Sequence, residues 1–192
     1  FSGHATPEFT GVDTRDYANN QSKVADGNVE QAKQILAQGG WTDTDGDGIV
    51  EKNGTKASFD LYYPPDYLDR QSLSTVFAEQ AKQLGIEVKL VGADWDTIYA
   101  NMYSSAALMQ QTSPDPYKSI YQQYHSKEMD GFYMNPNLYN DSASDALMEK
   151  AMASNDFNQA NSLWAESALV NGHGWGPAGD APWVWIANYD YN

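Results

Sequence analysis

Residues 28–63 read NVEQAKQILAQGGWTDTDGDGIVEKNGTKASFDLYY, a pattern of a helix, a glycine stop, an acidic turn-rich loop and a strand. Asn28 is a good helix N-cap and Gly39-Gly40 a good stop, so the pattern predicts a helix between them. Residues 58–63 alternate in polarity, which predicts a strand after a turn-rich acidic loop. The helix is predicted to bury a single apolar stripe, because four apolar residues recur at helical spacing: Val29, Ala32, Ile35 and Leu36.

The rest of the chain continues the alternation of helix and strand. This order favours a parallel or mixed sheet covered by helices, which is an α/β fold. Gly85 is expected to end the second helix and Asp94 to cap the third. The predicted elements are a helix over 66–84, a strand over 86–91, a helix over 94–103, a strand over 106–109, helices over 116–124, 142–153 and 156–170, and a last strand over 182–192.

Length and composition exclude several classes of protein. A chain of 192 residues is long enough for one well-buried α/β domain. The net charge of -15, with 11 Lys and Arg against 26 Asp and Glu, argues against a nucleic-acid partner. The absence of cysteine excludes disulfides, thiolate metal sites and a cysteine nucleophile. No apolar run approaches the roughly 20 residues of a membrane helix.

Residues 1–27 contain few apolar residues and several turn formers, which predicts an extended arm packed on the domain or on another lobe. Residues 28–192 are predicted to form a single α/β lobe. The final predicted strand stops with aromatic residues still in register, so we expect an excised or truncated piece of a longer chain.

Aromatic side chains are abundant between the predicted strands and helices. They lie in polar company, which favours a surface that receives a ligand or partner, or residues that cap the edges of a sheet. These residues are Tyr117, Tyr121, Tyr124, Phe132, Tyr133 and Tyr139.

The acidic loop has the spacing of an EF-hand calcium loop at its first, third and fifth positions, with Gly48 at the sixth. The twelfth position, where a bidentate Glu is expected, is Gly54, and a strand follows instead of a helix. Asp-Gly repeats also form good turns without an ion. A structural turn and a calcium site both stay open, and the calcium ligands would be Asp43, Asp45, Asp47, Ile49 and Glu51.

No sequence motif predicts catalysis. The sequence has no G-x-S-x-G, S-x-x-K or P-loop motif. The three histidines are far apart in the sequence, and none has the spacing of a metal-binding motif. We therefore expect a binding protein and no enzyme. The alternative to the function given below is a calcium-stabilised extracellular carbohydrate-binding or interaction module, suggested by the acidic loop and the aromatic residues.

Five segments, in order, resemble one family: AKQILAQGGWTDTDGDGIVEKNGTKASFDLYY, AEQAKQLGIEVKLVGADWDTIY, SPDPYKSIYQQY, NPNLYNDSASDALMEKA and GDAPWVWIANYDY. They are similar to the C-terminal lobe of family 5 extracellular solute-binding proteins, the dipeptide, oligopeptide and nickel receptors of ABC importers. The resemblance implies one lobe of a type II periplasmic-binding-protein fold. It also implies an extracytoplasmic, lipid-anchored receptor for a peptide or related small solute, with a missing N-terminal lobe and membrane permease subunits as partners.

The resemblance also implies where the ligand binds. In this family the segment leading into Asp-Pro contacts the ligand, and here it comprises Gln110, Gln111, Thr112, Ser113 and Asp115. Dipeptide receptors of the family place an acidic side chain just before Asp-Pro, whereas this chain has amides and hydroxyls. Longer peptides, sugars and metal chelates therefore stay open as ligands, and so does the interpretation of this segment as a solvated loop.

Overall fold

The computed structural model describes residues 5–7, 27–110, 113–129, 131 and 133–189. Contacts divide the chain into two compact units, which are treated separately below. The sheet unit is Ala25–Gln110, and the helical unit combines Phe1–Val24 with Gln111–Asn192. Most of the predicted arm, at 1–4 and 8–26, lies outside the described residues, so the arm and the single lobe over 28–192 stay predictions.

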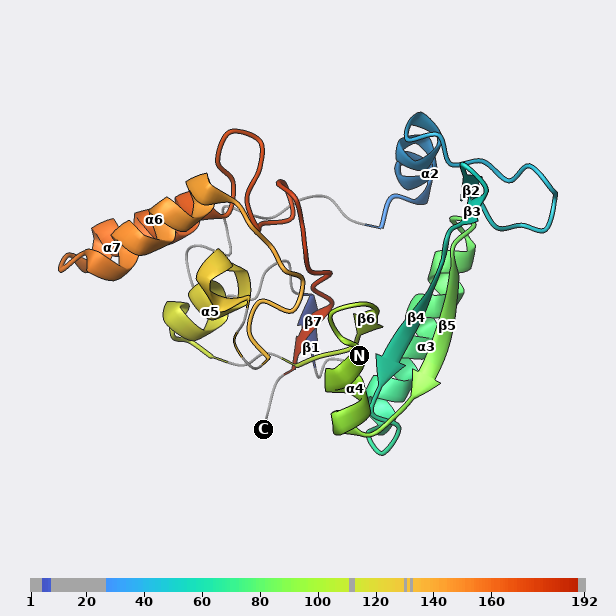
Figure 1. Ribbon diagram of the computed structural model, residues 1–192, viewed down its shortest axis with the longest axis horizontal. Helices are drawn as coiled ribbons and strands as arrows, with labels where there is room; N and C mark the ends of the chain where they lie inside the picture. The colour runs from blue at the N-terminus through green and yellow to red at the C-terminus, as the bar shows by residue number, and fades with distance from the viewer. Residues whose placement is uncertain (1–4, 8–26, 111–112, 130, 132, 190–192) are drawn as a thin grey trace. The chain divides into compact units, whose positions relative to one another are not determined.

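The sheet unit is built on three parallel strands in the order β5-β4-β6. The central strand β4 (Ser58–Tyr63) pairs in register with β5 (Glu87–Gly92), so that Leu61 lies opposite Leu90. Its other edge pairs with the short strand β6 (Ala106–Ala107). Helix α3 (Leu68–Lys82) connects β4 to β5 and lies along them (Figure 1). The α/β prediction is confirmed.

Small residues let α3 approach the sheet. Ala78 and Ala81 of α3 are buried together with Leu61 of β4 and Val88 of β5. Gly85 ends the turn after α3 with a positive φ of 73°, a conformation that costs glycine little. Helix α4 (Trp95–Asn101) follows β5, and the Asp94 carboxylate caps it by accepting the Thr97 N–H at 2.9 Å. Both predicted helix boundaries are therefore confirmed.

The predicted first helix is present as α2 (Val29–Gln38). The Asn28 side chain accepts the Gln31 N–H at 3.0 Å, and Gly40, with φ 84°, turns the chain out of the helix. The predicted buried stripe is wrong, because α2 has no buried residue and Ile35 is 61% exposed. An amphipathic pattern records polarity along one helix, but burial needs a second surface, and the other three residues of the stripe, Val29, Ala32 and Leu36, are only partly buried.

The helical unit centres on an antiparallel pair of helices, α6 (Ser142–Ala153) and α7 (Phe157–Ser167). The Asp141 and Asp156 carboxylates cap their N-termini. The Ser144 hydroxyl donates to the Ser167 carbonyl at 2.9 Å and joins the two helices inside the core. Smaller elements precede them: a π-helical turn η1 (Tyr117–Tyr121), a short α5 (Gln122–Tyr124) and a 3-10 turn η2 (Ser126–Glu128).

Tyr124, predicted with five other aromatic residues to lie at a surface or a sheet edge, lies instead in the core of the helical unit, and Tyr121 and Tyr139 pack against that core. Tyr117 and Tyr133 are partly buried, and Phe132 lies outside the described residues. Tyr124 is 0% exposed, and its ring stacks on buried Trp175 with centroids 4.8 Å apart. The Trp175 indole donates to the Ser167 hydroxyl at 2.9 Å. Burying two large rings side by side stabilises a unit that has little sheet of its own.

Antiparallel pairs complete both units. In the helical unit, β1 (Ala5–Pro7) pairs with β7 (Ala187–Tyr189), the described part of the predicted last strand. In the sheet unit, β2 (Glu51–Lys52) pairs with β3 (Thr55–Lys56) as a hairpin after the acidic loop. None of the helices in the described residues is long and apolar enough to cross a membrane.

Candidate functional site

The carboxyl edge of the parallel sheet is the candidate ligand-binding edge. The chain leaves β4 for α3, leaves β5 for α4, and leaves β6 for Gln110. Figure 1 shows the arrowheads of β4 and β5 at the end of the sheet unit where α4 lies. Ligands of open α/β sheets bind outside the carboxyl ends of the strands, where the connecting loops expose polar groups.

Arg70 contacts one residue from each of these three connections. Arg70 is the third residue of α3, and its Cζ lies 4.7 Å from the ring centroid of Tyr67 and 5.0 Å from that of Trp95. Its Nη2 donates a hydrogen bond to the Gln110 side-chain oxygen at 2.8 Å. We call Tyr67, Arg70, Trp95 and Gln110 the arginine cluster. The hydrogen bond within it joins Arg70 to a residue 40 positions further along the chain.

The guanidinium of the arginine cluster is only partly satisfied. Its Nη1 is buried and has no hydrogen-bond acceptor among the described residues. Its described contacts are two aromatic rings and a neutral amide, and none is a carboxylate. A buried donor without an acceptor is uncommon in folded proteins, and such groups often mark places where a ligand or water completes the bonding.

The predicted ligand segment is divided between the two units. Gln110 is exposed and belongs to the arginine cluster. Gln111 and Thr112 lie outside the described residues. In the helical unit, the Asp115 N–H donates to the Ser113 hydroxyl at 3.1 Å, and the Asp115 carboxylate accepts the Tyr117 N–H at 3.1 Å. Ser113 and Asp115 therefore build the start of η1.

Sequence reasoning missed Tyr67, Arg70 and Trp95. A signal was present, because Arg70 follows a predicted strand by one short turn and Tyr67 precedes it by three residues, close to one helical turn. The contribution of Trp95 comes from a different connection. That contact depends on the pairing of β4 with β5, which no local pattern shows.

The acidic loop lies at the opposite, amino end of the sheet and folds on its own carboxylates. The two oxygens of Asp43 accept the N–H groups of Gly46 and Gly48 at 2.7 and 2.9 Å. Asp45 accepts the Asp47 N–H at 3.2 Å, and Asp47 accepts the Ile49 N–H at 2.9 Å. Such side-chain turns hold a loop without an ion.

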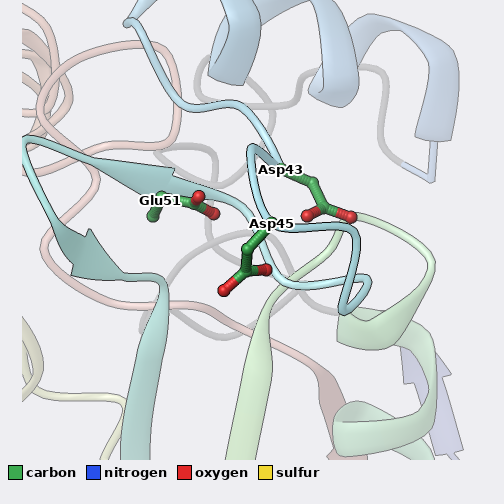
Figure 2. A group of neighbouring side chains, drawn as sticks. All are labelled: Asp43, Asp45 and Glu51. Carbon is green, nitrogen blue, oxygen red and sulfur yellow. The ribbon is translucent and has the colours of Figure 1, made fainter.

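Three of the five predicted metal ligands come together. Oxygens of Asp43, Asp45 and Glu51 lie within 4.8 Å of one another. Figure 2 shows Asp43 and Asp45 on the loop and Glu51 on the neighbouring strand β2. One Glu51 oxygen accepts the Thr44 N–H at 2.9 Å, and its Oε2 is buried with no hydrogen-bond partner in the described part of the chain. These are hard oxygen ligands of the type that calcium prefers.

A lysine occupies the other side of the acidic loop. The Lys56 ammonium donates to the Asp45 carboxylate at 2.9 Å and also to the Asp47 carboxylate. Hydrogen bonds to Asp47 and Asp45 raise the pKa of Lys56. The hydrogen bonds from Lys56 and from the Ile49 N–H lower the pKa of Asp47. Lys56 therefore neutralises part of the charge that a cation would meet, and Asp47 faces it instead of joining the three clustered carboxylates.

A second polar network lies in the glycine-rich turn of the helical unit. The Asp180 carboxylate contacts His173 Nδ1 at 3.0 Å and accepts the Tyr139 hydroxyl at 2.9 Å. The contact with Asp180 raises the pKa of His173, and contacts with His173 and Tyr139 lower the pKa of Asp180. The network closes the turn between α7 and the last strand.

Comparison with known proteins identifies the class to which this fold and edge belong. The sequence model of the "Bacterial extracellular solute-binding proteins, family 5 Middle" matches residues 1–131. The oligopeptide-binding protein AppA of Bacillus subtilis is 33% identical over 136 residues, which are 69% of this chain and 25% of AppA. The chain belongs to the family 5 extracellular solute-binding proteins.

Solved structures of the same class agree with the fold. The structure of AppA in complex with a nonapeptide matches with a TM-score of 0.74 and 26% identity, over 96% of this chain and 37% of that one. A Thermotoga maritima oligopeptide-binding protein with bound mannohexaose matches with a TM-score of 0.79 at 16% identity, over 99% and 37% of the two chains. The chain thus spans about a quarter of the curated relative and little more than a third of these structures.

Proposed function

We propose that this chain is part of an extracytoplasmic receptor that captures a peptide or a related small solute for an ABC importer. The observation that carries the proposal is the arginine cluster at the carboxyl edge of the sheet in a family 5 chain. This edge offers aromatic faces, an amide and a cation, which are the groups that recognise a peptide. The identity to an oligopeptide-binding protein supports the same ligand class.

The proposed ligand contacts are the segment from Gln110 to Asp115. Gln110 offers an exposed amide at the sheet edge, and Ser113 offers a hydroxyl at the start of η1. Gln111 and Thr112 complete the proposed set from the residues between them. Asp115 contributes by shaping the η1 turn, because its carboxylate already accepts the Tyr117 N–H. Binding of this kind captures the solute and delivers it unchanged, so no catalytic step is proposed.

The proposed partners follow from the family. An N-terminal lobe would supply the opposite wall of the binding cleft, and closure of the two lobes would present the solute to permease subunits in the membrane. A lipid anchor would hold the receptor at the outer face of the membrane. These proposals extend beyond the residues of this chain, which spans 25% of the length of AppA.

A calorimetric titration with short peptides tests the proposed function. The protein as its gene encodes it is expected to bind at least one peptide length class with micromolar affinity or better. The 192-residue chain alone is expected to bind the same peptide far more weakly, because it spans 25% of the length of AppA and the proposed N-terminal lobe would supply the opposite wall of the cleft. Tight binding of oligosaccharides or metal chelates with no response to any peptide would overturn the peptide assignment.

Calcium binding at Asp43, Asp45, Asp47, Ile49 and Glu51 stays a prediction. The three clustered carboxylates favour it, and the Lys56 ammonium competes with it. The alternative function as a calcium-stabilised carbohydrate-binding or interaction module would gain support if calcium and a polysaccharide both raised the melting temperature.

A further inference from the structure

His125 is a buried titratable side chain that takes no part in the proposed ligand contacts. It lies between α5 and η2 and is 1% exposed. The ring stacks on Tyr121 of η1, with centroids 4.2 Å apart, and burial raises the pKa of the Tyr121 hydroxyl, so this neighbour stays neutral. The His125 carbonyl accepts the side-chain N–H of buried Asn135 at 3.1 Å. Neutral groups therefore hold the imidazole in one place.

The two ring nitrogens of His125 have different surroundings. Nδ1 accepts the Lys127 N–H at 3.1 Å and so caps η2. An imidazole nitrogen accepts a hydrogen bond only when it carries no proton, so this contact places the ring proton on Nε2. Nε2 is buried and forms no hydrogen bond within the described part of the chain. The neutral ring thus satisfies one nitrogen and leaves the other without a described acceptor.

Two carboxylates of α6 face the ring. Glu149 Oε1 lies 3.5 Å from Nε2, and Asp145 Oδ1 lies 3.7 Å from Nδ1. Glu149 also accepts the Lys127 ammonium, and the contacts with Lys127 and then with His125 lower the pKa of Glu149. The other charged residue of η2 is Glu128. Each nitrogen of this buried ring is therefore close to an anion.

We propose that His125 is a proton-operated switch between η2 and α6. In the neutral state, Nδ1 caps η2 by accepting the Lys127 N–H. Uptake of a proton from water at Nδ1 turns this acceptor into a donor, which then faces the Lys127 N–H, and the cap opens. The imidazolium has a carboxylate near each N–H, Asp145 at Nδ1 and Glu149 at Nε2. Histidine suits such a switch because it exchanges a proton under mildly acidic conditions.

Each state of the switch satisfies a different set of contacts. The neutral state keeps the cap of η2, and the charged state pairs a buried cation with carboxylates, which such a cation needs. Ser126, the first residue of η2, already donates its N–H and its hydroxyl to Asp145 at 3.2 and 2.6 Å. The imidazolium competes with these two bonds for Asp145. Proton uptake is therefore expected to loosen η2 on α6.

Nuclear magnetic resonance tests the switch in the protein as its gene encodes it, with isotope-labelled histidine rings and backbone amides. At neutral pH the His125 ring is expected to show the tautomer that carries its proton on Nε2. In mild acid it should become an imidazolium, and the Lys127 amide signal should follow the same titration curve. Solvent exchange of the Lys127 amide, corrected for the intrinsic effect of pH, should rise by about twofold to tenfold, the factor for losing one ordinary hydrogen bond.

Two variants and a control separate the switch from a purely structural role. His125→Asn keeps a side-chain oxygen that can accept the Lys127 N–H but takes up no proton, so the Lys127 amide should lose its dependence on pH. Glu149→Gln removes the anion that faces Nε2, so the ring should titrate at lower pH. Glu166→Gln removes a carboxylate of α7 that accepts the Ser162 hydroxyl, and it should leave the ring titration unchanged.

The possible results decide the inference without reference to a solute. A ring that stays neutral until the protein unfolds in acid overturns the switch. A Lys127 amide that does not follow the ring, or that still titrates in His125→Asn, overturns the link to η2. If His125→Asn does not fold, the ring and amide titrations of the wild-type protein still decide. Peptide binding enters none of these measurements, so failure of the switch and failure of the proposed function are distinguishable.

Discussion

The two ends of the parallel sheet differ in how well their polar and charged groups are paired. At the amino end, the Val50 N–H donates to the Gly85 carbonyl at 2.8 Å, and the Ala57 N–H donates to the Val50 carbonyl at 2.8 Å. The acidic loop there satisfies its carboxylates with backbone N–H groups and with Lys56. At the carboxyl end, Arg70 keeps a buried nitrogen without a described acceptor.

This difference suggests different roles for the two ends of the sheet: the amino end stabilises the fold, and the carboxyl end is proposed to bind the solute. In the acidic loop, the carboxylates of Asp43 and Asp47 accept backbone N–H groups and those of Asp45 and Asp47 pair with Lys56, and the loop connects helix α2 to strand β2. An end that holds a cation between two rings without an anion has bonding capacity left for a ligand. At the amino end, Glu51 Oε2 is a buried oxygen with no hydrogen-bond partner among the described residues, and calcium binding would have to use it.

The largest expected effect is a loss of stability at the amino end of the sheet. Gly85→Ala should lower the free energy of unfolding by about 1–3 kcal/mol, since alanine is strained at positive φ. The added Cβ would also lie 2.9 Å from Val50 Cγ1. Urea unfolding measures the loss. Gly46→Ala is the matched control, because Gly46 also has positive φ but its added Cβ meets nothing within 4 Å. Equal losses in the two variants would show that Val50 does not restrict this site.

A smaller effect is expected at the carboxyl end. Trp95→Leu removes one face of the arginine cluster and the stack on Tyr99, whose centroid lies 5.4 Å away. The expected loss of stability is about 1 kcal/mol, with weaker peptide binding in the proposed receptor. Thermal unfolding and calorimetry measure the two quantities. Trp95→Phe keeps an aromatic face and should restore most of both, and a Phe variant no better than Leu would contradict the role of the ring.

Lys56→Met tests whether the Lys56 ammonium stabilises the acidic loop in place of a metal ion. Removing the ammonium leaves Asp45 and Asp47 facing each other, so the melting temperature in a chelator should fall slightly. Millimolar calcium should then raise the melting temperature of Lys56→Met more than that of wild type. Lys52→Met, on the paired strand β2, controls for loss of charge. A larger calcium response in wild type would show that Lys56 does not compete with the ion.

The smallest expected effect depends on pH at the carboxyl end. Hydrogen bonds from Thr97 lower the pKa of Asp94 below its ordinary value of 3.8. A lowered folded pKa means that the carboxylate stabilises the protein above pH 3.8 and loses this contribution as the pH falls through the folded value. Asp94→Asn should cap α4 nearly as well and remove this dependence. Its difference from wild type in melting temperature should shrink to zero in acid, and a constant difference would contradict the assignment.

Local patterns predicted the elements well. The bounds of α2, with Asn28 as its cap, and those of β4 are confirmed, as is the stop at Gly85. Each depends on hydrogen bonds or side-chain alternation within a few residues. The buried stripe on α2 is wrong, because burial depends on a facing surface that no local pattern contains. The core position of Tyr124 was missed for the same reason, since its stacking partner Trp175 is distant in sequence.

Order and short spacing along the chain predicted the family and the α/β alternation, and they left both a structural turn and a calcium site open for the acidic loop. The contact of Lys56 with Asp45, 11 residues away, and the contacts of Arg70 with Trp95 and Gln110 could be found only in the folded structure. The physical reason is the parallel pairing of β4 with β5 and β6, which brings three separate connections to one edge. The family resemblance predicted that Gln110 belongs to the ligand segment. The Arg70 side chain beside it could be recognised only once the pairing of the strands was known.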